Sequence, residues 1–383
     1  MRGSSVFRWL LVGGALALSA CGSGASAPGG SAAVPAAPPA AAGSAPAAQL
    51  PAAPTAAATA PANLTHARFG SQLVAGDVAL FVADDLGYFQ QHGIDFELVP
   101  FSSASEMIPA LATDQLEVGS LAANPAGFNA IARGVPIKSV LDKGSFPPGQ
   151  GDQALAIRKE VYDAGRGHTL SDLKGLNIGF TPPGKGTTSA CALSAGMQRA
   201  GASLDELVIQ PLNFPDMVPA LANGAIDGAM ITEPFLTRAV QQGSAVRVMG
   251  IDQMYPNFQI STLGFAPSFI ANRPAAKGFA AAYILASRAY IDAVAGRPSP
   301  ITRARIDELI AEHTKIDAAT VHEMGLPGLN PNGLPNKDAM MYCYQFFRDQ
   351  GLIPEPVTDA QFASLWATDL VNEVLDEIGR VPE

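Results

Sequence analysis

The sequence predicts an α/β protein of two lobes joined by two hinge strands. Short apolar runs of strand type alternate with segments of helical periodicity from Arg68 to Ala266. A Gly/Pro-rich crossing at Gly144–Gly151 divides this alternation into two sets, and Ser261–Ala266 is interpreted as a strand that returns to the first set. A chain that leaves one lobe, builds a second and comes back must cross between the lobes twice.

The first set is predicted to hold four strands with helices between them. The strands are expected at residues 68–74, 96–101, 117–120 and 137–141. The helices are expected near residues 77–91, 104–113 and 125–133. This order of strand and helix is that of one α/β lobe.

The second set follows the apolar segment Ala154–Arg158 and has the same alternation. Its strands are expected near residues 176–180, 207–211, 226–231 and 245–249, and its helices near residues 187–200, 216–223 and 234–241. After the return strand the pattern is mainly helical, with helices expected near residues 275–294, 302–313, 337–349 and 360–378.

The first 20 residues have the layout of a secretory signal. Arg2 and Arg8 precede an apolar run, Trp9–Leu18, that is too short to be a comfortable membrane span. The run ends in Leu-Ser-Ala-Cys, which resembles a bacterial lipobox and implies cleavage before Cys21 and lipid attached to that residue. The alternative is an ordinary signal peptide with an accidental cysteine.

Residues 22–65 have the composition of a tether. They contain 19 Ala, 8 Pro, 5 Gly and 4 Ser among 44 positions and no charged residue. Such a segment has too little to bury to form a core. We therefore expect residues 21–65 to be a lipidated cysteine followed by a disordered Ala/Pro-rich tether.

The charge of the remaining chain excludes some partners. Apart from Arg2 and Arg8, the chain carries 22 Lys and Arg against 34 Asp and Glu, a net charge of −12. This balance argues against nucleic acid and against an anionic membrane surface as partner. No apolar run after the signal is long enough to span a bilayer.

Three segments carry a resemblance to a known family. They are VALFVADDLGYFQQHGIDFELVPF at Val78–Phe101, SDLKGLNIGF at Ser171–Phe180, and MVPALANGAIDGAMITEPFLTRAVQQG at Met217–Gly243. These segments resemble periplasmic solute-binding proteins of the nitrate/sulfonate/taurine and thiamine-precursor type. The resemblance covers residues 67–272 well and the rest only in helical character.

The resemblance implies a type II periplasmic binding fold with a ligand cleft between its lobes. The implied first lobe comprises residues 66–151 and 266–383, and the implied second lobe residues 152–265. The protein is then expected to be an extracytoplasmic monomer, anchored by lipid at Cys21, that delivers a small ligand to an ABC permease in the membrane. Cys191 and Cys343 would lie in different lobes, and we interpret both as buried small hydrophobic residues rather than as a disulfide.

A glycine-rich loop in the second set is a candidate anion site. Gly179–Gly186 comes close to a P-loop, but Gly186 stands where a P-loop has the Ser or Thr that holds magnesium. A nucleotide site is therefore not expected. The loop still precedes a helix start, where backbone N–H groups attract anions or carbonyl oxygens. Its candidate residues are Thr181, Lys185, Thr187 and Thr188, with a plain strand-to-helix turn as the alternative.

Thr232 and Glu233 are candidates because they end a predicted strand. In an open α/β sheet, ligands are met at the carboxyl ends of strands. Pro234 suits the first turn of the helix that follows, so both residues could instead only cap that helix.

The remaining site candidates come from the implied cleft edge of the first lobe and from aromatic residues. Ser102, Ser103 and Asn124 precede predicted helices, where capping alone would also explain them. Gln72 and Asp77 follow the first strand and complete this edge. Phe146 and Phe214 are available as aromatic walls.

Two ligand chemistries remain open. Oxyanions such as sulfonates or nitrate would suit the helix N-termini and Lys185. A flat heterocycle, such as a thiamine-precursor pyrimidine or a flavin, would need aromatic walls and a hydrogen-bonding carboxylate. Phe101, Phe146, Phe214, Tyr255, Phe258 and Glu233 could supply these. A carboxylate opposes an anion, so Glu233 favours the heterocycle slightly.

Enzyme signatures do not occur. There is no HExxH or GxSxG motif, and the five His residues have no ligand spacing, so neither a metal nor a cofactor is expected. A pyrimidine-synthesising enzyme shares the implied fold, but its cysteine-rich motif has no counterpart here. The other alternative is a module that presents its ligand-bound form to a membrane sensor.

Overall fold

The computed structural model describes residues 63–382. The predicted signal peptide (residues 1–20), the lipidation site at Cys21 and nearly all of the predicted tether lie outside the described residues. Within residues 63–382, no helix combines the length and the apolar character needed to cross a membrane.

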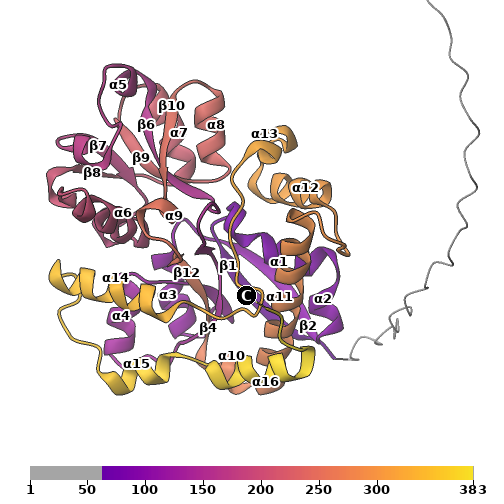
Figure 1. The fold of residues 1–383 in the computed structure, drawn as a ribbon. Coiled ribbons are helices and arrows are strands. Elements are labelled where there is room, and N and C mark those ends of the chain that lie inside the picture. The colour runs from indigo at the N-terminus through magenta and orange to yellow at the C-terminus, as the bar shows by residue number, and fades with distance from the viewer. Residues whose placement is uncertain (1–62, 383) are drawn as a thin grey trace, which may run out of the picture. The chain divides into compact units, whose positions relative to one another are not determined.

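The first sheet has five strands in the order β2-β1-β3-β12-β4 (Figure 1). They are β1 (Thr65–Ser71), β2 (Ile94–Pro100), β3 (Val118–Ala122), β4 (Lys138–Asp142) and β12 (Ser261–Phe265). Strand β1 is parallel to β2 and β3, whereas β12 runs antiparallel between β3 and β4. The four strands predicted in the first set and the return strand are thus confirmed.

The helices of the first set are α1 (Val78–Asp85), α2 (Tyr88–Gln91), α3 (Ala104–Ala112) and α4 (Pro125–Ala132). A single helix was expected at residues 77–91, but Gly87 adopts a left-handed conformation with φ of 67° and separates α1 from α2. Glycine reaches this conformation at no steric cost, so the helix ends there.

The second sheet also has five strands, in the order β10-β6-β9-β7-β8. They are β6 (Gln153–Arg158), β7 (Asn177–Phe180), β8 (Val208–Pro211), β9 (Gly228–Thr232) and β10 (Ala245–Gly250). The helices of this set are α5 (Lys159–Asp163), α6 (Thr188–Arg199), α7 (Phe214–Ala222), α8 (Phe235–Gln241) and α9 (Ile251–Met254). The predicted elements are confirmed, while α5 and α9 were not expected.

Two antiparallel segments carry the chain between the sheets. Strand β5 (Ser145–Phe146) pairs with β11 (Phe258–Gln259), and the Ile260 N–H donates to the Gly144 carbonyl at 3.0 Å. The crossings therefore support each other by backbone hydrogen bonds. Because β12 belongs to the first sheet, the return crossing ends before Ser261, earlier than the boundary expected after residue 265.

The C-terminal part is helical, as predicted. It comprises α10 (Pro267–Ala271), α11 (Arg273–Val294), α12 (Arg303–Thr314), α13 (Ala318–Glu323), α14 (Lys337–Asp349), α15 (Asp359–Leu365) and α16 (Thr368–Ile378). Helices α10 and α13 were not expected. The single helix expected at residues 360–378 is interrupted at Trp366, whose extended backbone forms a β-bridge to Ser139 of β4.

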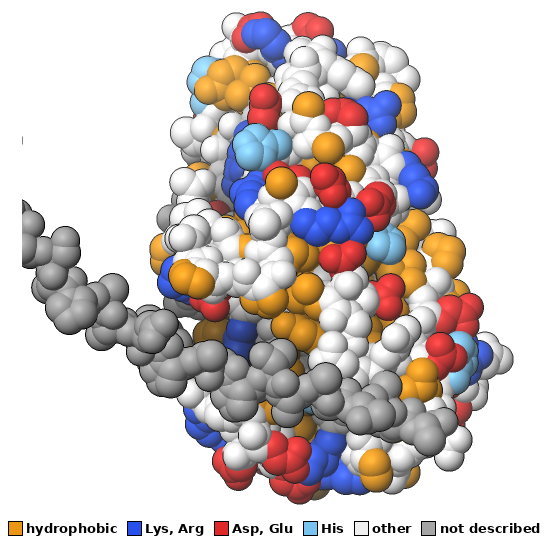
Figure 2. Space-filling model, turned by 90° about the vertical axis from the view of Figure 1, so that its right-hand side faces the viewer, with side chains coloured by type: hydrophobic (Ala, Val, Ile, Leu, Met, Phe, Trp, Pro, Cys, Tyr) orange, Lys and Arg blue, Asp and Glu red, His pale blue; other side chains and the backbone are white. Residues whose placement is uncertain are grey.

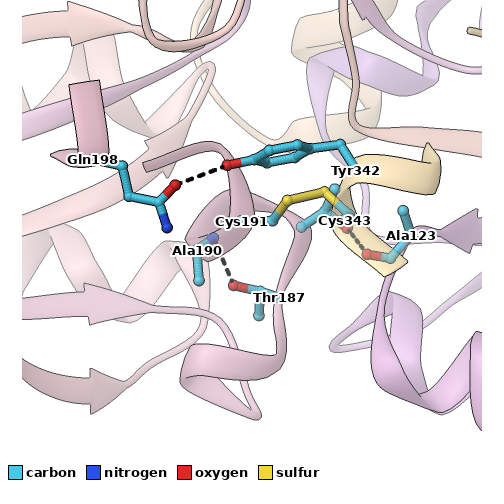
Figure 3. The surroundings of a disulfide bond; sticks show 8 residues. Ala123, Thr187, Ala190, Cys191, Gln198, Tyr342 and Cys343 are labelled. Atoms are coloured by element: carbon cyan, nitrogen blue, oxygen red, sulfur yellow. Dashed lines mark hydrogen bonds between the residues drawn. A yellow bond between two sulfur atoms is a disulfide. The ribbon is translucent and has the colours of Figure 1, made fainter. Parts of the chain in front are cut away.

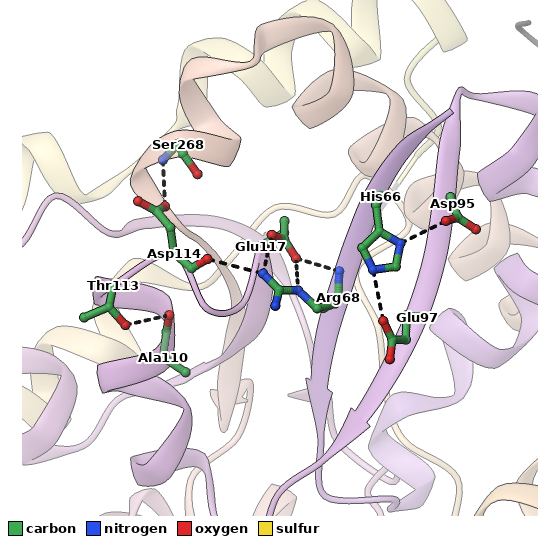
Figure 4. Close-up of polar contacts among 9 residues, drawn as sticks. All are labelled: His66, Arg68, Asp95, Glu97, Ala110, Thr113, Asp114, Glu117 and Ser268. Atoms are coloured by element: carbon green, nitrogen blue, oxygen red, sulfur yellow. Dashed lines mark hydrogen bonds and ion pairs between the residues drawn. The ribbon is translucent and has the colours of Figure 1, made fainter. Parts of the chain in front are cut away.

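Polar pairs connect β1 to the strands on either side of it. Figure 4 shows Arg68 of β1 donating to both carboxylate oxygens of Glu117, and His66 lying between Asp95 and Glu97 of β2. On the face drawn in Figure 2, basic and acidic side chains are interspersed rather than separated by sign. Among the ion pairs of the protein, Arg305 contacts three carboxylates, those of Asp85, Glu308 and Glu312.

A disulfide joins Cys191 of α6 to Cys343 of α14, so the prediction of two free cysteines was wrong (Figure 3). The Cα atoms are 5.7 Å apart although 152 residues separate the two cysteines in sequence. Helix α14 packs on α6, and the Tyr342 hydroxyl donates to Gln198 of α6 at 3.4 Å. The sequence did not reveal this pairing, because it forms only when the C-terminal helix α14 packs on α6 of the second set.

We expect loss of the disulfide to lower the free energy of unfolding by about 2–4 kcal/mol, because the bond closes a long loop in the unfolded chain. Urea unfolding of the wild type with and without reductant measures this difference. The matched control is the double variant Cys191→Ser/Cys343→Ser. Its free energy of unfolding should equal that of the reduced wild type and should not change when reductant is added. An unfolding midpoint of the wild type that does not change on reduction would contradict the assignment.

Candidate functional site

A cavity of about 100 Å³ lies between the two sheets. Residues at the ends of strands in both sheets, in the crossings and at the starts of helices form its wall. Nine of the predicted site residues line it: Gln72, Ser103, Asn124, Phe146, Thr181, Thr187, Thr188, Phe214 and Thr232. The structure thus brings together candidates from both predicted lobes at one cavity.

Three helices begin at the cavity. Ser103 precedes α3, Asn124 precedes α4 and Thr187 precedes α6, and all three line the wall. Asn124 accepts a hydrogen bond from the Gly127 N–H at 2.9 Å, and Thr187 accepts one from the Ala190 N–H at 3.3 Å. The positive ends of three helix dipoles therefore face the same space, which favours an oxygen-rich or anionic group there.

The two sides of the cavity touch at the start of α6. The Thr188 hydroxyl donates to the carbonyl of Ala123, which follows β3, at 3.3 Å. On the opposite side, the Ala75 N–H donates to the Glu233 carbonyl at 3.3 Å. Backbone and hydroxyl groups from the two sheets thus meet around the cavity.

A buried ion pair stands at the cavity wall. Lys143 lines the cavity and lies 2.6 Å from Asp77, with only 6% and 1% of the two side chains exposed. Asp77 also accepts a hydrogen bond from the Ser71 hydroxyl. Asp77 itself does not line the cavity, so its place is behind Lys143. Among the described residues that line the cavity, Lys143 is the one Lys or Arg, and Asp77 neutralises it.

Asp152 is the second charged residue of the wall. Its side chain is 7% exposed, and burial raises its pKa to about 6, with Lys143 acting in the opposite direction. Its carbonyl accepts hydrogen bonds from the Glu233 N–H at 2.7 Å and from the Thr232 hydroxyl at 3.0 Å. The backbone of Asp152 is thereby held against the end of β9.

Hydroxyl and aromatic groups complete the wall. Ser189 donates to Gln153 at 3.0 Å, and Asn124 donates to Ser105 at 3.3 Å. The apolar part of the wall includes Phe146 and Phe214. The wall therefore offers several neutral hydrogen-bonding groups beside a small apolar surface.

Four predicted site residues do not line the cavity. They are Asp77, Ser102, Lys185 and Glu233. Lys185 is directed to Asp205 at 2.6 Å, in a pair that is largely exposed. The geometry gives no support to a ligand contact from Lys185.

Glu233 is engaged within the protein. One carboxylate oxygen accepts from the Thr237 N–H at 2.9 Å, and the other accepts from the Thr237 hydroxyl at 3.0 Å and the Gly325 N–H at 3.2 Å. Burial raises its pKa. These contacts match the capping interpretation of Glu233. Of the two predicted residues at the end of β9, Thr232 lines the cavity and Glu233 does not.

Sequence reasoning missed Lys143 and Asp152. Both lie in the segment between β4 and β6, which was recognised only as a crossing because Gly and Pro dominate it. A signal did exist, since a Lys and an Asp flank a crossing that must pass the cleft. The hydroxyls of Ser105, Ser120 and Ser189 were also missed, although they stand beside predicted residues.

The family model described as "NMT1/THI5 like" matches residues 77–296. A binding protein of Brucella abortus is 26% identical over 157 residues, which are 40% of this chain and 44% of that protein. The chain thus spans less than half the length of the curated relatives it matches.

Solved structures share the fold. The nitrate-binding protein NrtA from Synechocystis has a TM-score of 0.67 at 15% identity, with 84% of this chain and 90% of that chain covered. The alkanesulfonate-binding protein SsuA from Xanthomonas axonopodis has a TM-score of 0.60 at 18% identity, with 77% of this chain and 96% of that chain covered. The desulfurization enzyme DszB has a TM-score of 0.55 at 14% identity, with 82% of this chain and 99% of that chain covered. These matches confirm the two-lobed periplasmic binding fold.

We expect Glu233→Gln to lower the free energy of unfolding by about 1–3 kcal/mol, because the new amide places N–H groups against donors that the carboxylate accepted. Ligand affinity should stay within about twofold, a change of roughly 0.4 kcal/mol. Urea unfolding and titration calorimetry measure the two quantities, with the exposed Glu160→Gln as control. A tenfold loss of affinity in a folded variant would restore the ligand role.

Proposed function

Because the chain belongs to the NMT1/THI5-like family, we propose that it is an extracytoplasmic solute-binding protein that captures a small molecule and delivers it to an ABC permease. The observation that carries this proposal is the cavity between the two sheets, at which the N-termini of α3, α4 and α6 meet. Cavities at the carboxyl ends of strands are the usual ligand sites of α/β proteins.

The ligand is proposed to carry an oxygen-rich group that lies at the three helix N-termini. Lys143 is neutralised by Asp77, so helix dipoles and hydroxyl groups would hold this group instead of a free cation. Nitrate and alkanesulfonates have such groups, and two proteins of the same fold are named as binding proteins for these compounds. Sulfonates therefore become better candidates than the sequence alone suggested, because Glu233 is occupied elsewhere.

The size of the cavity favours a small ligand. Drug-sized ligands occupy pockets of about 300–1,000 Å³. The cavity is about 100 Å³, so a flavin would require the lobes to move apart. Lobes that close on a ligand would give the permease a shape that differs from the open form.

The membrane attachment is proposed from the sequence before Ala67. The lipobox-like Leu18–Cys21 and the uncharged tether together support a lipoprotein whose body moves above the membrane. Cys21→Ser should release the protein from the membrane fraction, as fractionation and immunoblotting would measure. A variant that still sediments with membranes would require another attachment.

We expect Ser105→Trp to abolish ligand binding, because Ser105 lines the cavity and an indole would fill it. The matched control is Ser102→Trp, at an exposed position that does not line the cavity. A thermal-shift screen of nitrate, sulfonates and pyrimidines should give stabilisation of about 2.7 kcal/mol at a hundred times the dissociation constant. The wild type and Ser102→Trp should respond alike, and Ser105→Trp should not respond.

Equal responses of the two tryptophan variants would place the ligand elsewhere. A wild type that responds to no compound would contradict the proposed ligand class.

A further inference from the structure

The carboxylate of Asp152 is buried and faces the cavity without a partner. It is 7% exposed and belongs to the cavity wall. Within residues 63–382, no ion pair reaches it, and no hydrogen bond to it is found except from its own backbone N–H. A buried polar group normally has a partner, so an open carboxylate at a ligand cavity points to a group that the ligand supplies.

The position of this carboxylate is fixed by the fold. Asp152 stands where the first crossing enters β6, and its carbonyl accepts from Thr232 and Glu233 at the end of β9. The side chain therefore starts from a backbone that two hydrogen bonds hold in place. Such a carboxylate is pre-organised for a ligand at little further cost in conformational freedom.

The charged groups around Asp152 do not form an ion pair with its carboxylate. Lys143 attracts it but forms its own ion pair with Asp77, whose charge opposes that of Asp152. Arg247 of β10 attracts it from beyond ion-pair distance. Glu233 and the buried Tyr290 are the other titratable groups whose fields couple to it. The nearby carboxylates make a bare anion next to Asp152 unfavourable.

We infer that Asp152 recognises a nitrogen of the ligand, either a protonated amine or an N–H donor, at the opposite end from the oxygen-rich group. This inference rests on the proposed function and narrows it to aminated ligands. An amine on a short chain that ends in a sulfonate or carboxylate has this chemistry, and so does an aminated heterocycle. One carboxylate and three helix N-termini would then match a ligand that is positive at one end and negative at the other.

The test compares ligand pairs that differ only in the amine. The pairs are taurine with isethionate, β-alanine with 3-hydroxypropionate, and 4-aminopyrimidine with pyrimidine, titrated by calorimetry into the full-length protein. We expect the aminated member of at least one pair to bind about 10- to 150-fold more tightly, the range for a hydrogen bond to a charged group. Asp152→Asn should remove this preference, whereas Asp205→Asn, an exposed control, should keep it.

The pH dependence of binding gives a second measurement. Binding of an amine requires ionised Asp152, whose pKa is about 6. Affinity for the aminated ligand should therefore rise about tenfold between pH 5 and pH 8, with most of the rise below pH 7, and then level off. Asp142 also has a pKa of about 6, but its effect would persist in Asp152→Asn, so the difference between the two profiles reports Asp152.

The outcomes separate the two proposals. Binding of the oxygen-rich compounds without preference for an amine would overturn the inference and leave the proposed function standing. Affinity that rises as the pH falls below 6 would also overturn it, because a protonated Asp152 would then be donating to an anion. If no compound binds the wild type, the proposed ligand class fails as well. If Asp152→Asn does not fold, the wild type still decides, because titration of Asp142 would affect both members of a ligand pair alike, whereas protonation of Asp152 at pH 5 would remove the preference for the amine.

Discussion

The buried ion pair between Lys143 and Asp77 determines the electrostatics of the cavity. Removing one partner of such a pair costs about 3–5 kcal/mol, because the other charge is left alone in a poorly solvated place. The pair joins the segment after β1 to the segment after β4, where the chain leaves the first sheet. Since Asp77 neutralises Lys143, the wall offers an anion dipoles and hydroxyls rather than a free cation. Because Lys143 is paired with Asp77, Asp152 has no ion-pair partner within residues 63–382.

The connections between the sheets limit how the site can change shape. The crossings pair as β5 and β11, and the disulfide joins α6 to α14. Helix α6 also supplies Thr188 and Ser189 to the cavity wall, and Thr187, which precedes it, lines the wall as well. Any closure would therefore pivot near the paired crossings, with the start of α6 held by the helix that carries Cys343. An oxidising compartment, which the proposed location provides, would keep this bond formed.

The sequence predicted the fold well and the site in part, for identifiable reasons. Strands and helices were recognised because apolar periodicity reports which face is buried. Ser103 and Asn124 were found because residues of these types precede helices, and Thr187 because it follows a glycine-rich loop at a helix start. Asp152 and Lys143 lie in a crossing without periodicity, so only the three-dimensional path brings them to the cavity. The Glu233 carboxylate is held by Thr237, four residues away, and also by Gly325, which is distant in sequence, as is α14 for the disulfide.

The central claim is that a small ligand lies between the sheets with its oxygen-rich group at the starts of α3, α4 and α6. A crystal structure of the protein with the tightest-binding compound tests this claim most directly. The account predicts ligand oxygens within hydrogen-bonding distance of the residues that begin these helices, and a ligand nitrogen beside Asp152. A ligand bound outside this cavity, or one with its oxygen-rich group against Asp152, would contradict it.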